Sequence, residues 1–352
     1  MIKSLEFIDF TCFDDNKFEF SSGINVFIGR NGTGKTHILK TIAATIAAND
    51  EFIHSTSQSK ERFESIIAEK LVSYFRPEQL GRLARRQVGR VSSKVSLDID
   101  GQLIAFSFSG NSKTSVKLEQ SPNIAQISSL YLPPREMFSL FEGFLGLNAQ
   151  RELAFDETYV KLAEALDSPI LRGPRYDEIK KLISPLENAL QAKAIKENGR
   201  FYLKEKNQLL EAQLVAEGLR KIASVMYLIT NGSLKPTNNS ILFWDEPESN
   251  LNPLLITVVC DLLRQLAGDN VQIFIATHDY LLTHQLSLYS EYRDKNTPPM
   301  KFFCLEKQDE NGVKVQTGST LADIDNNPIL NEYAAFYELE QSFFDKSIEK
   351  IK

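Results

Sequence analysis

The chain has 352 residues, of which 42% are hydrophobic and 24% charged, and its formal net charge is −6. This balance is typical of a folded globular protein and excludes a disordered or fibrous chain, and the mild acidity argues against a protein dedicated to coating nucleic acid. The three cysteines form no CxxC pair, so neither a zinc site nor a disulfide framework is predicted. No signal-peptide core and no apolar run close to the ~20 residues of a membrane span are found, which predicts a cytoplasmic protein.

The first predicted elements enclose a glycine-rich loop. Residues 2–8 and 17–28 are expected to form strands, because both are rich in apolar residues and the second ends in a continuous apolar run. A helix is expected to begin directly after the loop. The loop consists of Gly29, Arg30, Asn31, Gly32, Thr33, Gly34, Lys35 and Thr36.

The middle of the chain mixes predicted helices and hairpins. Helical patterns cover residues 60–90 and 150–190, the second with breaks expected at Pro169, Pro174 and Pro185. Alternating patterns predict one hairpin over 94–118 and another over 191–205, with a short buried strand over 127–132 between them.

The last third predicts a strand–helix–strand unit. Residues 212–230 are expected to be helical, 240–244 and 271–276 to be apolar strands, and Pro253 to open the helix between these strands. A hairpin from 301–305 and 312–316 and a C-terminal helix are expected to follow. Continuous apolar strands joined by a helix indicate a parallel sheet that is covered on both faces.

The glycine loop has the spacing and the context of a phosphate-binding loop. Its backbone N–H groups, together with the N-terminus of the following helix, form a cradle for nucleotide phosphates. Gly29, Gly32 and Gly34 permit the backbone angles that such a cradle needs. Lys35 is expected to bind the β- and γ-phosphates and Thr36 to coordinate Mg²⁺, so the sequence predicts ATP and Mg²⁺ as ligands.

Two further groups follow the apolar strands. Asp245 and Glu246 end the 240–244 strand, where a carboxylate can hold Mg²⁺ and an adjacent glutamate can take a proton from the attacking water. His278 follows the 271–276 strand and is expected to face the same crevice, where a neutral imidazole can contact the γ-phosphate or the water. We therefore predict Asp245 as a metal ligand and Glu246 and His278 as catalytic residues.

These segments resemble ABC-type P-loop ATPases of the SMC/RecF/OLD-like branch. The glycine loop is similar to their Walker A motif, the segment 244–253 to the Walker B motif and D-loop, and His278 to the switch histidine. The resemblance implies an α/β fold with the ABC-ATPase head architecture, a mixed sheet with a largely parallel core and a helical and β-hairpin insertion. The implied division is an N-terminal part of the ATPase domain (1–50), an insertion (51–205) and a C-terminal part (206–352).

The resemblance also implies a signature loop, and here the pattern departs. The candidate is 215–221, in which Gly218 fits a nucleotide contact made across a dimer, but Ala216 stands at the serine position and Asn252 replaces the usual D-loop aspartate. An ordinary helix start is the other interpretation. No secure Q-loop glutamine is found. Arg135 and Glu136 are candidates for the edge of the site, and a surface turn is the equal alternative for both.

The implied function is an ATPase that acts as a nucleotide-dependent dimerisation switch. Because no nuclease motif follows His278, we expect a homodimer or higher oligomer that controls a separate effector, a nuclease or a toxin, in an anti-phage defence system. One alternative is a RecF/SMC-like repair ATPase that binds DNA, and another is a scaffold that binds ATP without hydrolysing it. Nucleic acid contact is suggested by a basic cluster, which is also consistent with a solvated helix: Arg82, Arg85, Arg86 and Arg90.

Overall fold

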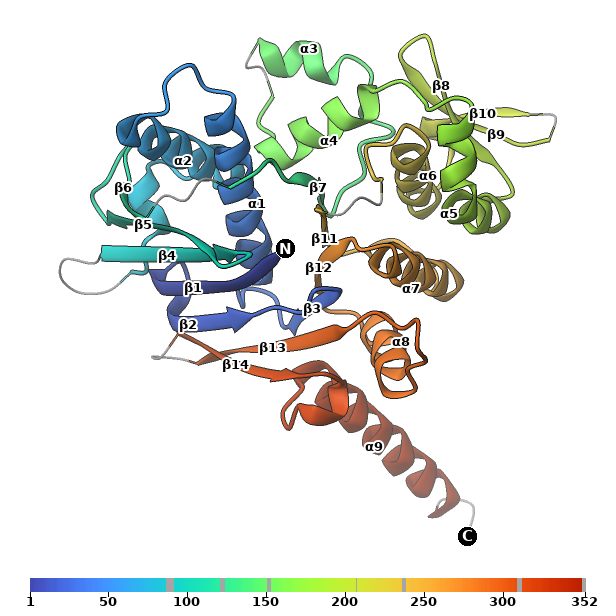
Figure 1. Ribbon diagram of the computed structural model, residues 1–352. Coiled ribbons are helices and arrows are strands. Elements are labelled where there is room, and N and C mark those ends of the chain that lie inside the picture. The colour runs from blue at the N-terminus through green and yellow to red at the C-terminus, as the bar shows by residue number, and fades with distance from the viewer. Residues whose placement is uncertain are drawn as a thin grey trace.

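The computed structural model describes residues 1–86, 92–120, 124–150, 153–206, 208–235, 239–308 and 312–349. A six-stranded sheet runs through the middle of the molecule (Figure 1). Five of its strands are parallel, and the sixth, β14, pairs antiparallel with β13. In sheet order the strands are β14 (Gly312–Gly318), β13 (Met300–Gln308), β3 (Ile24–Gly29), β12 (Gln272–Thr277), β11 (Ser240–Asp245) and β7 (Ser128–Leu132).

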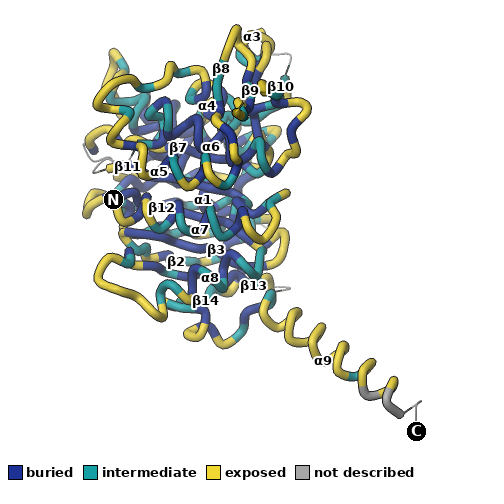
Figure 2. Tube along the Cα trace, turned by 90° about the vertical axis from the view of Figure 1, so that its right-hand side faces the viewer, coloured by how far each residue is buried: buried dark blue, intermediate teal, exposed yellow. Residues whose placement is uncertain are grey.

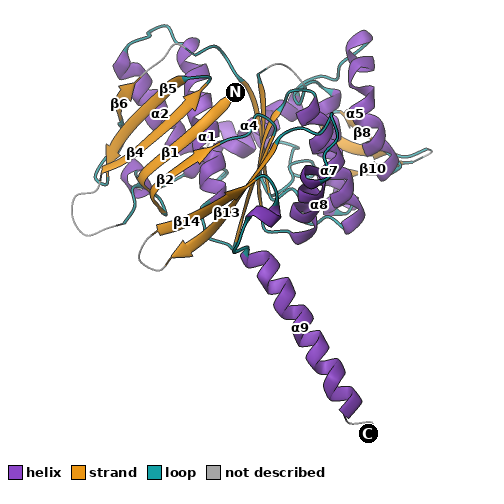
Figure 3. Cartoon of the chain, turned by 60° about the horizontal axis from the view of Figure 1, so that its bottom comes forward, coloured by secondary structure: helices purple, strands orange, loops and turns teal. Residues whose placement is uncertain are grey.

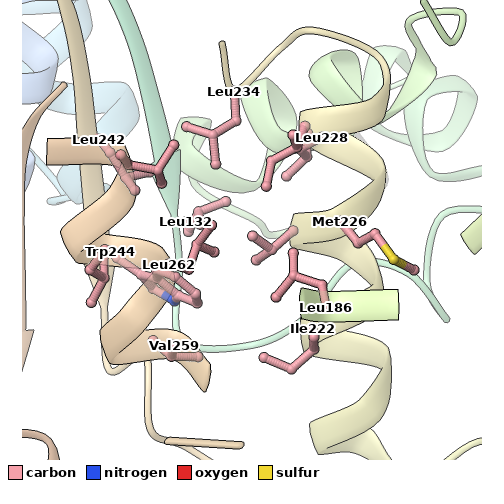
Figure 4. Close-up of a cluster of buried hydrophobic side chains, with 14 of the residues drawn as sticks. Leu132, Leu186, Ile222, Met226, Leu228, Leu234, Leu242, Trp244, Val259 and Leu262 are labelled. Carbon is pink, nitrogen blue, oxygen red and sulfur yellow. The ribbon is translucent and has the colours of Figure 1, made fainter. Parts of the chain in front are cut away.

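The central strands are buried on both faces because their apolar residues alternate between two cores. Leu242 and Trp244 of β11 belong to one core, shown in Figure 4, whereas Phe243 between them belongs to the other. This is the pattern expected of a parallel sheet that is covered on both sides. The predicted α/β fold with a largely parallel core is confirmed.

One face of the central sheet is covered by α1 (Lys35–Ile53), which lies between this sheet and a second one (Figure 1). The second sheet is antiparallel, and α2 (Lys60–Phe75) packs beside α1. Stacked and edge-on phenylalanine rings, among them Phe7, Phe10 and Phe13, fill the space under it. Its strands, in order, are β2 (Phe13–Glu19), β1 (Ile2–Phe10), β4 (Ser92–Ile99), β5 (Gln102–Ser109) and β6 (Lys117–Gln120).

Helices cover the other face, and a small sheet lies at the far end of this helical layer (Figures 1 and 3). The helices are α3 (Phe144–Ala149), α4 (Glu157–Asp167), α5 (Pro174–Leu190), α6 (Glu217–Thr230), α7 (Pro253–Gly268) and α8 (Tyr280–Glu291). The small sheet has the order β10 (Leu209–Glu211), β9 (Arg200–Lys204) and β8 (Lys193–Glu197). Short 3₁₀ turns lie at Leu80–Leu83, Ala212–Leu214 and Leu321–Asp323.

The last helix, α9 (Pro328–Glu349), leaves the body of the molecule and is exposed over nearly all its length, whereas the central strands are buried (Figure 2). Within the described ranges, no helix combines the length and the apolar character that a membrane crossing requires.

Several predicted elements are wrong in their limits. The expected strand over 17–28 is two strands, β2 and β3, and the expected helix over 60–90 ends at Phe75 because Arg76 adopts a left-handed conformation before Pro77. Pro185 does not break its helix but lies inside α5. Five buried apolar residues of α5 pack into the core, and this packing outweighs the backbone hydrogen bond that proline removes. The helix α8 was not predicted.

The three-part division of the chain stays a prediction, and the strand pairing crosses its boundaries. β4, in the proposed insertion 51–205, pairs with β1 of the N-terminal part. β7, in the same insertion, pairs with β11 of the C-terminal part and completes the edge of the central sheet. The proposed insertion therefore contributes strands to two sheets of the ATPase fold.

Candidate functional site

The glycine loop connects the end of β3 to the start of α1, at the carboxyl edge of the parallel strands. Gly29 and Gly34 have positive φ angles, and a Cβ atom at either position would collide with its surroundings: with the Leu305 carbonyl oxygen at 2.4 Å for Gly29, and with the Cys12 Sγ atom at 2.5 Å for Gly34. Gly32 also has a positive φ but faces open space. The three glycines are thus required by the loop conformation itself.

The loop encloses the Lys35 side chain. Its Nζ atom donates to the carbonyl oxygens of Gly29 (2.6 Å) and Arg30 (3.0 Å), and burial lowers the pKa of Lys35 while the nearby carboxylates oppose this shift. Thr33 is buried and donates to the Arg30 carbonyl, whereas Arg30 and Asn31 are exposed. The first turn of a helix leaves backbone N–H groups without intrahelical partners, so the start of α1 adds donors at the same place.

Asp245 faces α1 because it follows Ile241 and Phe243 on the same face of β11. One carboxylate oxygen accepts a hydrogen bond from the Thr36 hydroxyl at 3.1 Å, and the other accepts from the Tyr131 hydroxyl at 3.3 Å. Burial, reinforced by the Glu246 carboxylate, raises the pKa of Asp245 to about 6, and the two hydrogen bonds oppose this shift. The predicted pair of Thr36 and Asp245 is therefore brought into direct contact.

Glu246 and His278 lie side by side at the ends of β11 and β12. The Nδ1 atom of His278 is 3.7 Å from Oε1 of Glu246, and both side chains are partly exposed, at 48% and 35% respectively. Glu246 has a positive φ and its N–H donates to the Ala276 carbonyl oxygen, which turns its side chain out of the sheet. These two predicted residues thus border the same open region beyond the strand ends.

Glu248, to which the sequence analysis assigned no role, connects the two strand ends. Its Oε1 atom accepts from the Thr277 hydroxyl (2.7 Å) and the His278 N–H (3.2 Å), and it lies 3.7 Å from Nδ1 of His278. Burial raises the pKa of Glu248, and its second oxygen has no protein partner within the described ranges. The hydrogen bond from the His278 N–H to this carboxyl group holds in place the backbone from which the imidazole extends.

Lys221 is a second residue that the sequence analysis did not single out. It is 5% exposed, and its ammonium group donates to the Glu246 carbonyl oxygen, the Ser249 hydroxyl and the Pro134 carbonyl oxygen. Burial lowers the pKa of Lys221 to about 8. Lys221 lies on α6 and its ammonium group bonds to the turn after β11. These hydrogen bonds hold the backbone at Glu246 in place.

Gly218 is buried in the first turn of α6 and packs against its own chain. A Cβ atom there would lie 2.2 Å from the carbonyl oxygen of Asn250, which itself has a positive φ. This close approach alone requires glycine, so the nucleotide contact assigned to Gly218 remains a prediction. The neighbouring Ala216 and Glu217 are exposed at the N-terminus of α6.

The remaining predicted residues lie away from this centre or already have partners. Glu136 is buried and forms an ion pair with Arg220 at 2.7 Å, which assigns it to packing, whereas Arg135 is exposed. In the basic cluster, Arg82 pairs with Glu78 and Arg85 with Asp14, and Arg86 is exposed. Arg90 lies outside the described residues.

The residues present fit a nucleotide and Mg²⁺. The loop is a cradle that side chains would fill, and the Thr36 hydroxyl and the Asp245 carboxylate provide two oxygen ligands of the kind that Mg²⁺ takes alongside phosphates and water. Within the described ranges no group of three or more His, Cys, Asp or Glu side chains is arranged to hold a metal ion.

Comparisons with known proteins agree with this geometry. A family model described as "AAA domain, putative AbiEii toxin, Type IV TA system" matches residues 102–283, just over half of the chain. The chain belongs to this family. It is a P-loop ATPase with an AAA domain.

Distant relatives extend the likeness to nearly the whole chain. A Helicobacter pylori (strain ATCC 700392 / 26695) protein named "ATP/GTP phosphatase" is 20% identical over 358 residues, covering 88% of this chain and 94% of the relative. An SMC head solved with the C-winged helix domain of ScpA superposes with a TM-score of 0.53 at 14% identity, over 90% of this chain and 97% of the other. An Smc head from Pyrococcus furiosus, bound to the C-terminal domain of ScpA, gives 0.50 at 12% identity, over 97% and 99%. These structures confirm the ABC-ATPase head fold of this AAA-family chain.

Proposed function

We propose that this chain hydrolyses ATP in the presence of Mg²⁺ and uses the nucleotide to control its own dimerisation. The observation that supports this most directly is the convergence of Lys35, Thr36 and Asp245 at one edge of the sheet, with Glu246 and His278 beside them. No other arrangement of the described residues combines a phosphate cradle, oxygen ligands for a divalent cation and a candidate base for water.

Phosphate binding is assigned to the loop and to α1. The ammonium group of Lys35, now bonded to two loop carbonyls, is placed to exchange these partners for the β- and γ-phosphate oxygens, which form stronger charge-assisted hydrogen bonds. Thr36 and Asp245 are the residues that hold Mg²⁺, which when bound neutralises charge on the phosphates. The hydrogen bond from the Tyr131 hydroxyl holds the Asp245 carboxylate in its orientation.

Hydrolysis is assigned to Glu246 and His278. Glu246 accepts a proton from water as the water oxygen attacks the γ-phosphorus, and the bond to the β–γ bridging oxygen breaks, which yields ADP and phosphate. The imidazole of His278 hydrogen-bonds the γ-phosphate or the attacking water, in an orientation set by Glu248. Lys221 stabilises the turn from which Glu246 projects.

The site is open on the side away from the sheet, which is why we propose a dimer. In a head-to-tail pair, the N-terminus of α6 in one copy closes the loop of the other, and its helix dipole and free N–H groups favour the γ-phosphate. Changing the dimer population from 1:99 to 99:1 requires about 5.5 kcal/mol. Charge-assisted hydrogen bonds to two γ-phosphates contribute to this difference.

We further propose that the switch is the regulatory subunit of an anti-phage defence system and acts on a separate nuclease or toxin. The description of its family refers to a type IV toxin–antitoxin system, and both SMC heads that it resembles were solved with a domain of a separate protein. The alternative of a DNA-repair ATPase gains less support, because Arg82 and Arg85 already have acidic partners. Charge reversal of Arg82 and Arg86 tests it: a loss of DNA affinity would favour that alternative.

Replacing Glu246 with Gln tests the proposed function. We expect phosphate release to fall by about 10²- to 10⁴-fold, as for the loss of a general base, while ATP binding remains. Trapped in the ATP state, this variant should be dimeric with ATP and Mg²⁺ and monomeric without them in sedimentation velocity. Lys35→Ala is the control that should bind ATP much more weakly and should stay monomeric at the ATP concentration that saturates Glu246→Gln.

Two results would contradict the proposal. Wild-type protein that binds ATP and releases no phosphate would be a non-catalytic scaffold. A Glu246→Gln variant that stays monomeric at saturating ATP would remove the dimerisation switch.

A further inference from the structure

The C-terminal helix α9 begins beside the nucleotide site and extends away from the molecule (Figures 1 and 3). Its 22 residues correspond to about 33 Å at a rise of about 1.5 Å per residue. It begins near the carboxyl ends of β3 and β13, because Glu332 pairs with Arg30 directly after β3, and Asn326, just before the helix, donates to Glu306 of β13.

The base of α9 contacts the glycine loop and the segment that follows β12. Glu332 forms an ion pair with Arg30 of the glycine loop at 3.5 Å. The ring of Tyr333 contacts that of Tyr280, two residues after His278, with centroids 4.5 Å apart. The buried Asn327 accepts hydrogen bonds from the first N–H groups of the helix. The direction of α9 is therefore fixed relative to the nucleotide.

Beyond this base, α9 exposes a broad apolar face. Its large apolar residues recur at spacings of three, four and seven, which places them on one half of the helix, the pattern of a helix that packs against a core. They are 39–68% exposed, although Tyr333 contacts Tyr280, and exposed apolar residues gathered on one face mark an interaction surface. They are Leu330, Tyr333, Phe336, Tyr337, Leu339, Phe343 and Phe344.

The charge of α9 indicates what kind of surface it meets. The helix has five acidic residues and one lysine. At the opposite end of the molecule, residues 191–206, which include the β8–β9 hairpin, have five basic and two acidic residues. Three of the basic residues pair with acidic residues of other segments: Lys193, Lys196 and Arg200. The complementarity therefore rests on the exposed Lys204 and Lys206. The two segments lie far apart in one chain (Figure 1), so their complementarity applies between two molecules.

A patch that matches the helix lies on this hairpin and beside α6. We define it by Lys204, Lys206, Leu209 and Leu214. All four are exposed, Leu209 and Leu214 at 45% and 78%, and Leu209 is paired with Lys204 across β10 and β9. Leu214 directly precedes the loop 215–221. The patch therefore combines cationic and apolar groups, as α9 combines acidic and aromatic ones, and it borders the N-terminus of α6.

We propose that α9 of one copy docks on this patch of a second copy. The inference rests on the proposed head-to-tail dimer. In that dimer the loop 215–221 of one copy faces the glycine loop of the other. The patch borders the first of these loops and α9 is attached to the second, so one twofold rotation that joins the loops also brings the helix and the patch together. Each dimer then has two such contacts.

Substitutions in α9, made in the Glu246→Gln background, test this contact. Phe336→Ser, Tyr337→Ser and Phe343→Ser together remove apolar surface beyond the base of α9 and leave Glu332 and Tyr333 in place. We expect ATP-dependent dimerisation, measured by sedimentation velocity, to weaken at least ~10-fold, while the affinity for a fluorescent ATP analogue stays within twofold. The matched control is Leu288→Ser with Tyr292→Ser, which removes exposed apolar residues in α8 and directly after its C-terminus.

A charge exchange identifies the partner surface. Glu338→Lys with Glu340→Lys, and separately Lys204→Glu with Lys206→Glu, are each expected to weaken the ATP-bound dimer, and the combination of all four to restore it. Unchanged dimerisation in the α9 variants and in the charge variants would overturn the docking and leave the dimerisation switch intact. A parent Glu246→Gln protein that never dimerises would instead reject the proposed function, so the two failures are distinguishable.

Discussion

The two halves of the proposed ATP site differ in how they are built. On the Walker side, the glycine loop, Lys35, Thr36, Asp245, Glu246 and His278 converge within one chain, held by hydrogen bonds between β3, α1, β11 and β12. On the signature-like side, Ala216 stands at the position where serine would make a polar contact. Gly218 packs directly against the carbonyl oxygen of Asn250. The Walker half is therefore a set of polar groups in contact with one another, whereas the signature-like half is the exposed first turn of α6.

This difference indicates where specificity and regulation lie. The Walker half has the groups needed to bind phosphate, and hydrogen bonds within one chain bring them together. The signature-like half supplies at most a helix N-terminus, which alone is a modest contribution of about 0.3–1 kcal/mol. We infer that closure of the dimer depends on additional contacts outside the nucleotide, which α9 is placed to provide.

The comparison is tested most severely at Lys35. Replacing it with Ala removes the hydrogen bonds from its ammonium group to the phosphates. Such a charged interaction contributes about 2–3 kcal/mol to the binding free energy. We expect the ATP dissociation constant to rise roughly 30- to 150-fold in isothermal titration. Lys17→Ala, at an exposed lysine on β2, is the control and should bind like the parent. Parent-like ATP binding by Lys35→Ala would mean that the Walker half is not the nucleotide site.

Gly218 sharpens the comparison on the other side. A Cβ atom at this position would lie 2.2 Å from the Asn250 carbonyl oxygen, so Gly218→Ala must displace the backbone of α6 or of the turn after β11. We expect a loss of about 1–3 kcal/mol in the free energy of unfolding by urea, as for overpacking. Gly268→Ala is the matched control, since no atom lies within 4 Å of its Cβ position.

If Gly218→Ala keeps its full stability but loses ATP-dependent dimerisation, the glycine serves the partner's nucleotide and not its own chain. If it loses stability while the nucleotide affinity of the monomer stays unchanged, the glycine is a packing residue. The two outcomes separate the two interpretations that the sequence left open.

Much of the Walker half was predictable because its signals are local. The glycine loop is eight consecutive residues between an apolar strand and a helix, and the apolar runs of β11 and β12 place Asp245 and His278 at strand ends. Side-chain periodicity even determines that Asp245 faces α1, since it follows Ile241 and Phe243 at a spacing of two.

What the sequence could not provide depends on contacts between distant segments. The close approach of Gly218 to Asn250 and the hydrogen bonds of Glu248 to Thr277 and His278 each join residues that local patterns treat separately. The exposure of α9 is also invisible in its pattern, because an apolar half-face predicts packing but not the molecule against which it packs. Lys221 left one signal: it falls on the apolar face of α6, four residues before Val225.

Lys221 connects the two halves, since it extends from α6 to the turn that holds Glu246. Its pKa is lowered to about 8 in the folded protein by burial, against an ordinary value of 10.5. Between these values the unfolded chain binds more protons than the folded one, so this group makes the protein more stable as the pH rises. The effect is on the order of 1 kcal/mol from pH 7.5 to pH 9.

Lys221→Met removes this titration and keeps the apolar stem. We therefore expect the stability of the parent relative to the variant, measured by urea unfolding, to increase by that amount between pH 7.5 and pH 9. Lys17→Met is the surface control, for which we expect the same difference at both values. A stability gap between parent and Lys221→Met that is constant over this range would show that the ammonium group is not buried as described. In that case the turn bearing Glu246 is held by other contacts, and the signature-like half contributes even less to the Walker half than the geometry indicates.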